Sequence, residues 1–182
     1  MGDLSWLDPE ELRVFRAFAR STRVLAVRFD QELQNDVGMP RTYFEILWLL
    51  HQAPDRSLRM SELAESTFSQ PSRISHAVGR LEKAGLVRRE LCSSDRRGWF
   101  AVLTDEGLAA LTVAAPRYAR SIREHLLGPL SPTQRDALVR IGETVLRELD
   151  RSSEPASGPE VSDIAEDMVR RGRRPPIRRS DR

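Results

Sequence analysis

The sequence of 182 residues contains one cysteine, Cys92, which excludes an intramolecular disulfide framework and a cysteine-based zinc finger. Its 3 histidines lie far apart and show no metal-ligand spacing. No apolar run approaches the roughly 18 residues of a transmembrane helix, and the acidic start of the chain lacks the basic and apolar regions of a signal peptide. Nucleophile–base pairs and glycine-rich phosphate loops are also missing. The sequence thus predicts a cytoplasmic protein that makes no membrane contact, needs no metal or cofactor, and is not an enzyme.

Lysine is almost absent as well, because 28 of the 29 basic residues are arginine and Lys83 is the exception. The codon bias of a GC-rich genome accounts for most of this, since arginine is spread along the whole chain. Guanidinium groups also suit phosphate recognition. The net charge is only +2, so the positions of the arginines are more informative than their number.

Apolar residues recur at steps of three and four along most of the chain, which is the periodicity of amphipathic helices. Glycine and proline mark the ends of several such stretches, among them Gly38 with Pro40, and Gly85. Pro116 lies inside a later stretch and is expected to kink or break it. The pattern predicts helices over residues 9–36, about 41–53, 60–66, about 70–84, 104–127 and 131–149.

Two short β-prone runs, residues 86–91 and 99–103, flank a polar segment that ends at Gly98, which indicates a hairpin with a charged tip. Before it, Ser69 is expected to cap a helix whose first turn holds Pro71. A short helix, a turn, a second helix and a hairpin form a winged helix-turn-helix, which presents its second helix to the major groove of DNA. The expected fold is mainly α with a small β-hairpin, and long helices flank the winged helix-turn-helix at both ends.

The second helix of this motif, about residues 70–84, is the expected recognition helix. Arginine and glutamine can make paired hydrogen bonds to base edges, and serine can contact bases or phosphates. Residues 69–99 hold 7 basic and 3 acidic side chains, an excess of four that is larger than the net charge of +2. His76 is equally well explained as a polar surface residue. The candidate DNA-binding residues of this region are Ser69, Gln70, Ser72, Arg73, His76 and Arg80.

Three segments carry a resemblance to a known family: SELAE at residues 61–65, RISHAVGRLEKAGLVRR at 73–89 and DRRGWFAVLTDEG at 95–107. Over roughly residues 10–150 the chain resembles the MarR family of bacterial transcription regulators. The last segment matches the wing signature of that family, in which an aspartate and an arginine precede a Leu-Thr pair and a glycine. The matching residues are Asp95, Arg97, Leu103, Thr104 and Gly107.

The resemblance gives the wing signature a role in DNA binding. Arg97 is the candidate for insertion into a narrow minor groove, where the negative potential is high, and Arg96 lies beside it in the DNA-binding set. Asp95 would repel DNA, so its expected role is to orient an arginine by a charge-assisted hydrogen bond. Thr104 is placed to cap the next helix. The alternative is that these charges form only a solvated hairpin tip. Arg88 and Arg89 alternate on a strand, so at most one of them should face phosphates.

The resemblance also implies a homodimer that binds double-stranded DNA at a palindromic operator, with two recognition helices about 34–36 Å apart. The expected function is that of a ligand-responsive repressor. The alternative is an architectural or constitutive DNA-binding protein without an effector. The corresponding domains are an N-terminal dimerisation helix (1–40), the winged helix-turn-helix (41–104, with a wing at about 86–103), C-terminal dimerisation helices (105–151), and a linker with a basic tail (152–182).

Many members of this family bind a small aromatic or anionic effector between the dimerisation helices and the winged domain. The candidate cleft residues here are Arg20, Tyr43, Trp48 and His51, although ordinary packing also explains Tyr43 and Trp48. Cys92 lies near arginines at the base of the wing, which makes a redox switch conceivable, but the chain has no second cysteine to pair with it.

Residues 152–182 depart from the resemblance. A stretch rich in Ser, Glu, Pro and Gly reads as a linker, and a basic end follows in which 7 arginines over residues 168–182 face only one acid, Asp181. Such an end could bind phosphates without sequence preference, or it could be a solvated tail.

Overall fold

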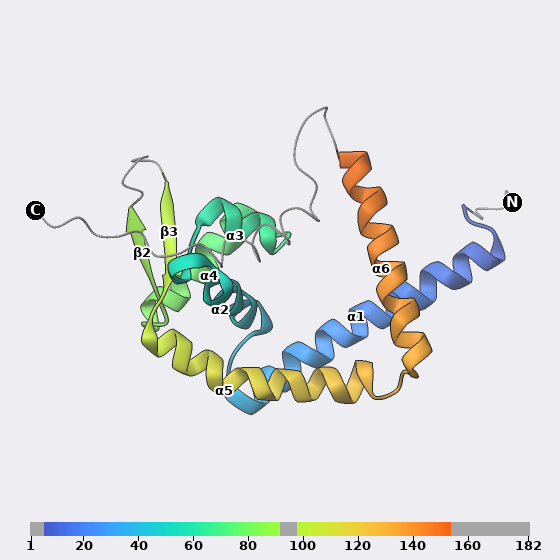
Figure 1. Ribbon diagram of the computed structural model, residues 1–182, viewed down its shortest axis with the longest axis horizontal. Coiled ribbons are helices and arrows are strands. Elements are labelled where there is room, and N and C mark those ends of the chain that lie inside the picture. Colours follow the sequence, from blue (N-terminus) through green and yellow to red (C-terminus); the bar gives the residue numbers. More distant parts are fainter. Residues whose placement is uncertain (1–5, 92–97, 154–182) are drawn as a thin grey trace, which may run out of the picture.

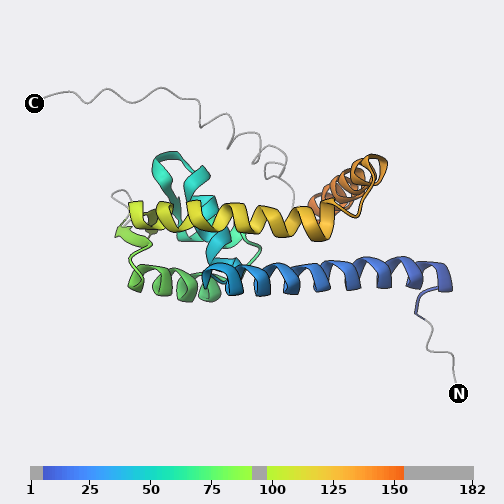
Figure 2. The same cartoon turned by 90° about the horizontal axis from the view of Figure 1, so that it is seen from below.

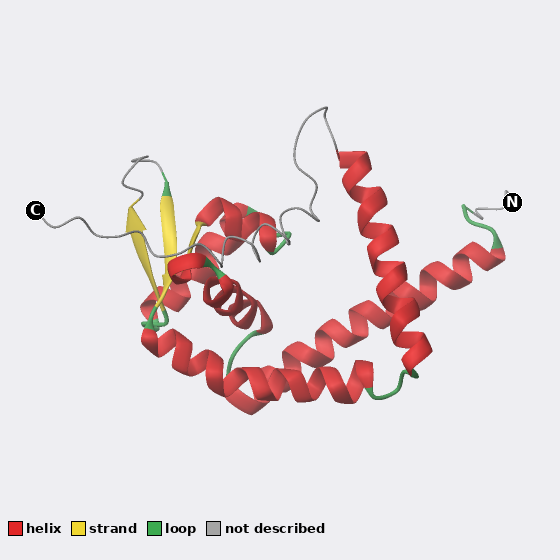
Figure 3. Cartoon of the chain, viewed as in Figure 1, coloured by secondary structure: helices red, strands yellow, loops and turns green. Residues whose placement is uncertain are grey.

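The computed structural model describes residues 6–91 and 98–153. It is mainly helical and has one small antiparallel sheet, as the sequence predicts (Figure 3). The helices are α1 (Pro9–Val37), α2 (Arg41–Gln52), the 3-10 turn η1 (Pro54–Arg56), α3 (Met60–Ser66), α4 (Pro71–Lys83), α5 (Asp105–Ile122), the π-helical segment η2 (Arg123–Leu127) and α6 (Pro132–Ser153). The strands are β1 (Ser57–Arg59), β2 (Val87–Leu91) and β3 (Trp99–Leu103).

The two long helices α1 and α5 lie side by side and run in opposite directions (Figures 1 and 2). Asp8 begins α1 by a capping box with Glu11, and Pro9 occupies the first turn. Gly38 ends the helix in the left-handed conformation, with a φ of +68°, which glycine adopts without steric cost. The ends that the sequence predicts for this helix are therefore confirmed to within a residue or two.

Polar bonds join the second half of α1 to the end of α5 and to η2. Glu32 accepts a hydrogen bond of 2.6 Å from the Ser121 hydroxyl, and its other oxygen lies 2.6 Å from Nε2 of His125. The Ser121 hydrogen bond, helped by His125, holds the pKa of the Glu32 carboxyl below its ordinary value. Arg120 and Asp36 form an ion pair of 2.5 Å beside this cluster. These bonds hold the C-terminal part of α1 against the end of α5 and η2.

The helices α2, α3 and α4 and the sheet enclose a hydrophobic core, and we call this part of the chain (residues 41–104) the winged lobe. Apolar side chains of these helices and of β2 form its centre. Each of the following side chains has at most 2% of its surface exposed: Ile46, Leu47, Leu50, Leu63, Ile74, Val78, Leu81 and Val87.

The sheet contains three strands in the order β1-β3-β2, and neighbouring strands are antiparallel. β2 and β3 form the predicted hairpin, with Val87 opposite Leu103 and Leu91 opposite Trp99. β1 corrects the sequence prediction, which places only two strands in the wing, at residues 86–91 and 99–103. A strand of three residues with one buried side chain, Leu58, is too short to show an alternating pattern. Pairing with β3 makes it a strand.

Two local expectations concern helix positions. Of the kink or break expected at Pro116, the break is absent, because α5 continues from Asp105 to Ile122. Pro116 and Thr112, whose carbonyl loses its helical partner, are both exposed, so water can replace the lost hydrogen bond. Ser69 is not the N-cap of α4. Its hydroxyl donates to the carbonyl of Thr67 at 3.1 Å, and Gln70 occupies the cap position without a side-chain bond.

At the other end of the molecule, α6 projects away from the winged lobe (Figures 1 and 2). We call residues 6–27 together with α6 the helical arms. None of the helices in the described part of the chain combines the length and hydropathy needed to cross a membrane. The arms nevertheless leave many large apolar side chains between 40% and 72% exposed: Trp6, Val14, Phe15, Phe18, Val24, Val27, Leu138, Val139, Ile141, Val145, Leu146 and Leu149.

Candidate nucleic-acid interface

One face of α4 is buried and the other is polar and exposed. Ile74, Ala77, Val78 and Leu81 point into the winged lobe. The opposite arc of the helix faces solvent and carries two arginines and a histidine at positions separated by three and four residues. The predicted DNA-binding residues Gln70, Ser72, Arg73, His76 and Arg80 are all exposed, and Ser69 is half-buried.

Arg89 connects strand β2 of the wing to helix α4. Its Nη2 donates a hydrogen bond of 2.7 Å to the carbonyl of Ser75, and its Nε lies 3.5 Å from the Glu82 carboxylate. Arg88, the preceding residue on β2, is more exposed and forms an ion pair of 2.6 Å with Glu90. The two arginines therefore face different sides of the strand. Arg89 orients the exposed face of α4 relative to the wing.

Part of the wing signature has a structural explanation. The Thr104 hydroxyl accepts a hydrogen bond of 3.0 Å from the Gly107 amide, which caps α5, and donates one of 2.7 Å to the carbonyl of Gly85 at the end of α4. A Cβ atom on Gly107 would lie 2.0 Å from the carbonyl oxygen of Leu86. The threonine cap is thus confirmed, and the glycine allows α5 to approach the start of the wing.

The tip of the wing lies outside the described residues. Asp95, Arg96, Arg97 and Cys92 all fall in this segment, so their assigned roles remain predictions from the sequence.

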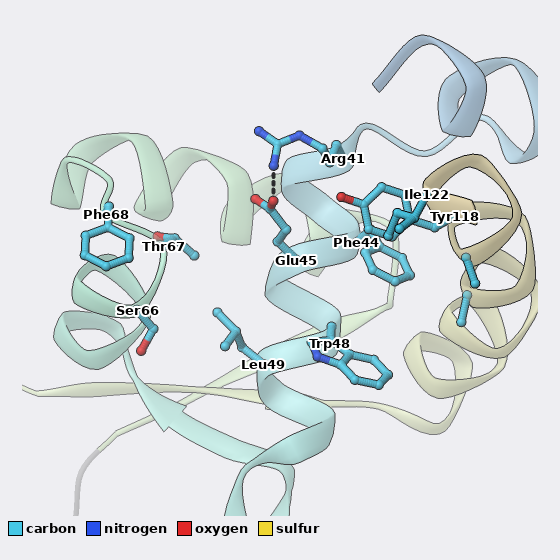
Figure 4. A pocket seen from close by; sticks show the side chains of 12 residues that line it. Arg41, Phe44, Glu45, Trp48, Leu49, Ser66, Thr67, Phe68, Tyr118 and Ile122 are labelled. Carbon is cyan, nitrogen blue, oxygen red and sulfur yellow. Dashed lines mark hydrogen bonds and ion pairs between the residues drawn. The ribbon is translucent and has the colours of Figure 1, made fainter. Parts of the chain in front are cut away.

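A cavity of 720 Å³ opens between α2, α5 and the turn that joins α3 to α4 (Figure 4). Aromatic rings dominate the wall on the α2 and α5 side. The rings of Phe44 and Tyr118 are 4.6 Å apart, and those of Phe44 and Trp48 are stacked at 6.4 Å. The lining residues are Arg41, Phe44, Glu45, Trp48 and Leu49 of α2, Ser66, Thr67 and Phe68 around the turn, and Ala115, Tyr118, Ala119 and Ile122 of α5.

The charged groups that line the cavity are one arginine and one glutamate, and they form an ion pair with each other. The Arg41 guanidinium contacts the Glu45 carboxylate (Figure 4). Burial raises the pKa of Glu45 above its ordinary value, although the Arg41 charge opposes this effect. Burial likewise raises the pKa of the Tyr118 hydroxyl. The cavity is therefore aromatic and close to neutral.

Of the four candidate cleft residues, the structure places only Trp48 in the wall of this cavity. Arg20 is exposed on α1, His51 is exposed at the end of α2, and Tyr43 packs half-buried against the core of the winged lobe. The helical phase of α2 explains the position of Tyr43, because residues 41, 44, 45, 48 and 49 share one side of the helix and residue 43 lies on another. His51 lies closer to the lining side, in the last turn of α2, where its ring is 6.0 Å from that of Trp48.

Sequence reasoning missed the remaining lining residues, above all Arg41, Phe44 and Tyr118. The phase of α2 was readable from the sequence, but the position of α5 opposite it was not. Over residues 6–91 and 98–153, the structure brings together no group of three or more His, Cys, Asp or Glu side chains that could hold a metal ion.

Known proteins resemble this chain in sequence and in structure. A sequence profile described as MarR family matches residues 37–98. Sco3205 of Streptomyces coelicolor, a MarR family transcriptional regulator solved in complex with DNA, is 43% identical with a TM-score of 0.77, over 85% of this chain and 97% of that one. AbsC, a MarR family regulator of the same organism, is 37% identical with a TM-score of 0.74, over 79% of this chain and 97% of that one.

Curated relatives agree with the solved structures. The transcriptional regulator HosA of Escherichia coli O157:H7 is 35% identical over 79 residues, which are 43% of this chain and 58% of HosA. The match thus spans little more than half the length of that relative. The HTH-type transcriptional regulator MhqR of Bacillus subtilis is 26% identical over 115 residues, or 63% of this chain and 77% of MhqR. These relatives are transcriptional regulators and not enzymes, as expected from the sequence. The chain belongs to the MarR family of transcriptional regulators.

Proposed function

We propose that this protein binds a palindromic DNA operator as a homodimer and represses transcription until an aromatic effector occupies the cavity. The observation that carries the DNA-binding part is the exposed arc of α4, where Arg73, His76 and Arg80 lie together. Arginine at such positions can bind guanine edges in the major groove. Arg97 at the tip of the wing would enter the adjacent minor groove, with Arg96 beside it and Asp95 orienting an arginine.

The apolar surface of the helical arms supports the homodimer. Exposed apolar side chains at helical spacing along two separate helices indicate a surface that a partner covers. A second copy of the chain supplies the same surface by twofold symmetry. Such a dimer would place its two α4 helices in successive major grooves, about 34–36 Å apart. In this assignment residues 1–40 and 105–151 form the dimer, and residues 41–104 bind DNA.

The position of the cavity supports effector control. Its walls come from α2 and α5 and from the turn directly before α4. A molecule bound there could change the orientation of α4, provided that it binds the DNA-free conformation more tightly than the DNA-bound one. The aromatic lining favours an aromatic molecule. Because Arg41 is already paired with Glu45, the lining favours an uncharged effector over an anion.

The first test is binding of the purified protein to the DNA upstream of its own gene, at two salt concentrations and against a scrambled competitor. We expect saturable binding that survives the competitor, with a protected palindrome. Weak binding that decreases steeply with salt would show that phosphate contacts dominate. That outcome would favour the architectural alternative, which lacks a specific operator.

Two substitutions sharpen this test. Arg73→Ala should lower the affinity for the operator about tenfold, because a paired base contact is worth roughly 1–3 kcal/mol. Arg97→Ala should lower it similarly if the wing enters the minor groove, and should leave the melting temperature unchanged. Arg123→Ala, which removes an exposed arginine of η2, beyond the end of α5 and far from the wing, is the matched control and should bind as the unaltered protein does. Equal losses in all three variants would contradict the assigned interface.

A screen of aromatic compounds for release of the operator tests the effector. We expect an uncharged aromatic compound to release the operator. Trp48→Ala should abolish this release at a limiting concentration of the compound. If no compound of this class changes DNA affinity, constitutive binding becomes the better description.

A further inference from the structure

Phe68 has an unusual position for a phenylalanine. It lies in the turn between α3 and α4, and 88% of its surface is exposed, more than for any other large apolar residue of the described chain. Its φ is +48°, in the left-handed region that side chains with a Cβ atom rarely adopt. The ring therefore buries little surface, and its backbone conformation is unfavourable.

The end of α4 shows what this kind of turn normally requires. At the end of α3, the Phe68 amide donates to the carbonyl of Glu65 and the Ser69 amide to that of Ala64. At the end of α4, the amide of Gly85 donates to Glu82, and the next amide to Leu81, in the same pattern. Both turns are Schellman motifs, whose left-handed position favours glycine. Because Gly85 occupies that position after α4, the fold alone does not account for a phenylalanine after α3.

The ring of Phe68 lines the cavity, on the side away from the other aromatic residues. Phe44, Trp48 and Tyr118 belong to α2 and α5, whereas Phe68 belongs to the turn (Figure 4). Its neighbour Thr67 donates its hydroxyl to the carbonyl of Leu63 at 2.7 Å, so that hydroxyl is already engaged. Phe68 is thus the large apolar group through which a bound molecule can contact the turn.

The turn leads directly into the proposed DNA-binding surface. Gln70 follows Phe68 by two residues, and Arg73 lies in the first turn of α4. A change in the backbone at Phe68 therefore alters the start of α4. Strained residues of this kind are found at switch regions, where the strain is held by the surrounding structure.

We propose that Phe68 senses the effector: its ring stacks on an uncharged aromatic molecule in the cavity and so couples occupancy of the cavity to the position of α4. This inference rests on the proposed function and names the residue through which it is regulated. Without a bound molecule the ring is exposed to water, so the conformation in which it covers an aromatic ligand gains apolar contact. This apolar contact forms only when the ligand is bound. The ligand therefore stabilises one conformation more than the other, as a shift between two conformations requires.

The test uses the full chain and the uncharged fluorescent probe N-phenyl-1-naphthylamine. Fluorescence titration gives the affinity for the probe, and amide hydrogen exchange over residues 61–83 reports on α3, the turn and α4 with and without the probe. The variants are Phe68→Gly, which suits the left-handed backbone, and Phe68→Asn, which tolerates that backbone and leaves the turn less flexible than glycine does. The matched control, Trp48→Ala, removes an aromatic group from the opposite wall.

In the unaltered protein, saturating probe should change exchange rates at residues 67–73 by about fivefold or more, the lower range of ordinary allosteric coupling. Both Phe68 variants should still bind the probe, with affinity lowered by about tenfold at most, as expected for the loss of one aromatic contact. At saturation they should show no change in exchange. Trp48→Ala should weaken probe binding, yet at saturation it should keep the full change.

Retention of the full exchange change in both Phe68 variants would overturn the inference. So would a probe that binds the unaltered protein without affecting residues 67–73, or that does not bind at all. A parallel titration with operator DNA separates these failures from failure of the proposed function. If the unaltered protein does not bind the operator, the regulator function is refuted. The exchange measurement would still decide the role of Phe68.

Discussion

The winged lobe and the helical arms use their apolar residues in opposite ways. In the lobe, Leu47 and Leu50 have no exposed surface. In the arms, Phe18 and Ile141 of the same chain are each 53% exposed. Both regions have amphipathic helices, so the local pattern is the same. The difference is that the helices of the lobe pack on each other and on the sheet, whereas the arms extend beyond them.

A single chain buries the apolar side chains of the winged lobe but leaves those of the helical arms exposed. The lobe has its own core and is expected to fold as a unit. The arms present an apolar surface larger than isolated surface residues would explain, so their stability should depend on a second copy and hence on protein concentration. Substitutions in the two regions should therefore differ in kind as well as in size.

The largest effect is expected in the core of the lobe. Leu47→Ala should lower the free energy of unfolding by about 3–4 kcal/mol, because it removes a fully buried side chain and leaves a cavity. Urea unfolding at two protein concentrations should give the same loss. Leu91→Ala, which truncates a lobe residue that is 59% exposed, should cost less than about 0.5 kcal/mol. Similar losses in both variants would mean that the lobe lacks the core described above.

A charge in the arms should act on assembly instead. Ile141→Asp should convert the proposed dimer to a monomer at micromolar concentration, measured by sedimentation, because an aspartate at the interface would lose its hydration. Loss of the second recognition helix should then lower operator affinity by about a hundredfold. Arg147→Asp, which places the same charge on the opposite face of α6, should leave both properties unchanged. A dimer that survives Ile141→Asp would exclude this face of α6 from the interface.

The junction between the arms and the rest of the chain offers a pH-dependent test. The pKa of Glu32 is lowered in the folded protein, so its bonds stabilise the fold above the ordinary pKa of 4.5 and lose this effect as the pH falls through the lowered value. Glu32→Gln should cost about 1–2 kcal/mol at neutral pH. The difference from the unaltered protein should disappear in acid.

The control for this test is Glu124→Gln, which changes an exposed carboxylate on η2. It should alter the free energy of unfolding by less than about 0.5 kcal/mol at any pH. If the loss in Glu32→Gln does not depend on pH, hydrogen bonding by the carboxylate does not account for the stability of this junction.

The smallest effect is expected beyond the arms. Truncation after Ser153, the last residue of α6, should leave a folded dimer with an unchanged melting temperature. Operator affinity at low salt should decrease only if the arginines over residues 168–182 contact phosphates. Aggregation or monomer formation by the truncated chain would place the tail within the fold and refute the domain boundary near residue 151.

The sequence predicted most of the elements because their signals are local. Gly38 and Gly85 end helices through backbone conformations that glycine favours, and Thr104 caps α5 through its own hydroxyl. Each depends on a few neighbouring residues. The strand β1 escaped prediction because its three residues are held by β3, more than 40 positions later in the chain. At Pro116 the sequence left a kink or a break open, and only the tertiary structure shows that α5 continues there and faces water.

The candidate site divides in the same way. Periodicity and the helix-turn-helix order were sufficient to place Arg73, His76 and Arg80 on the exposed face of one helix. The cavity was beyond the sequence, because Trp48, Phe68 and Tyr118 meet only when α2, the turn and α5 are packed together. By itself the sequence determined the helices, the helix ends at Gly38, Gly85 and Thr104, and the polar face of α4, which follow from interactions between near neighbours. Tertiary structure alone decided the third strand, the lining of the cavity and the exposure of Phe68, since these depend on contacts between distant segments.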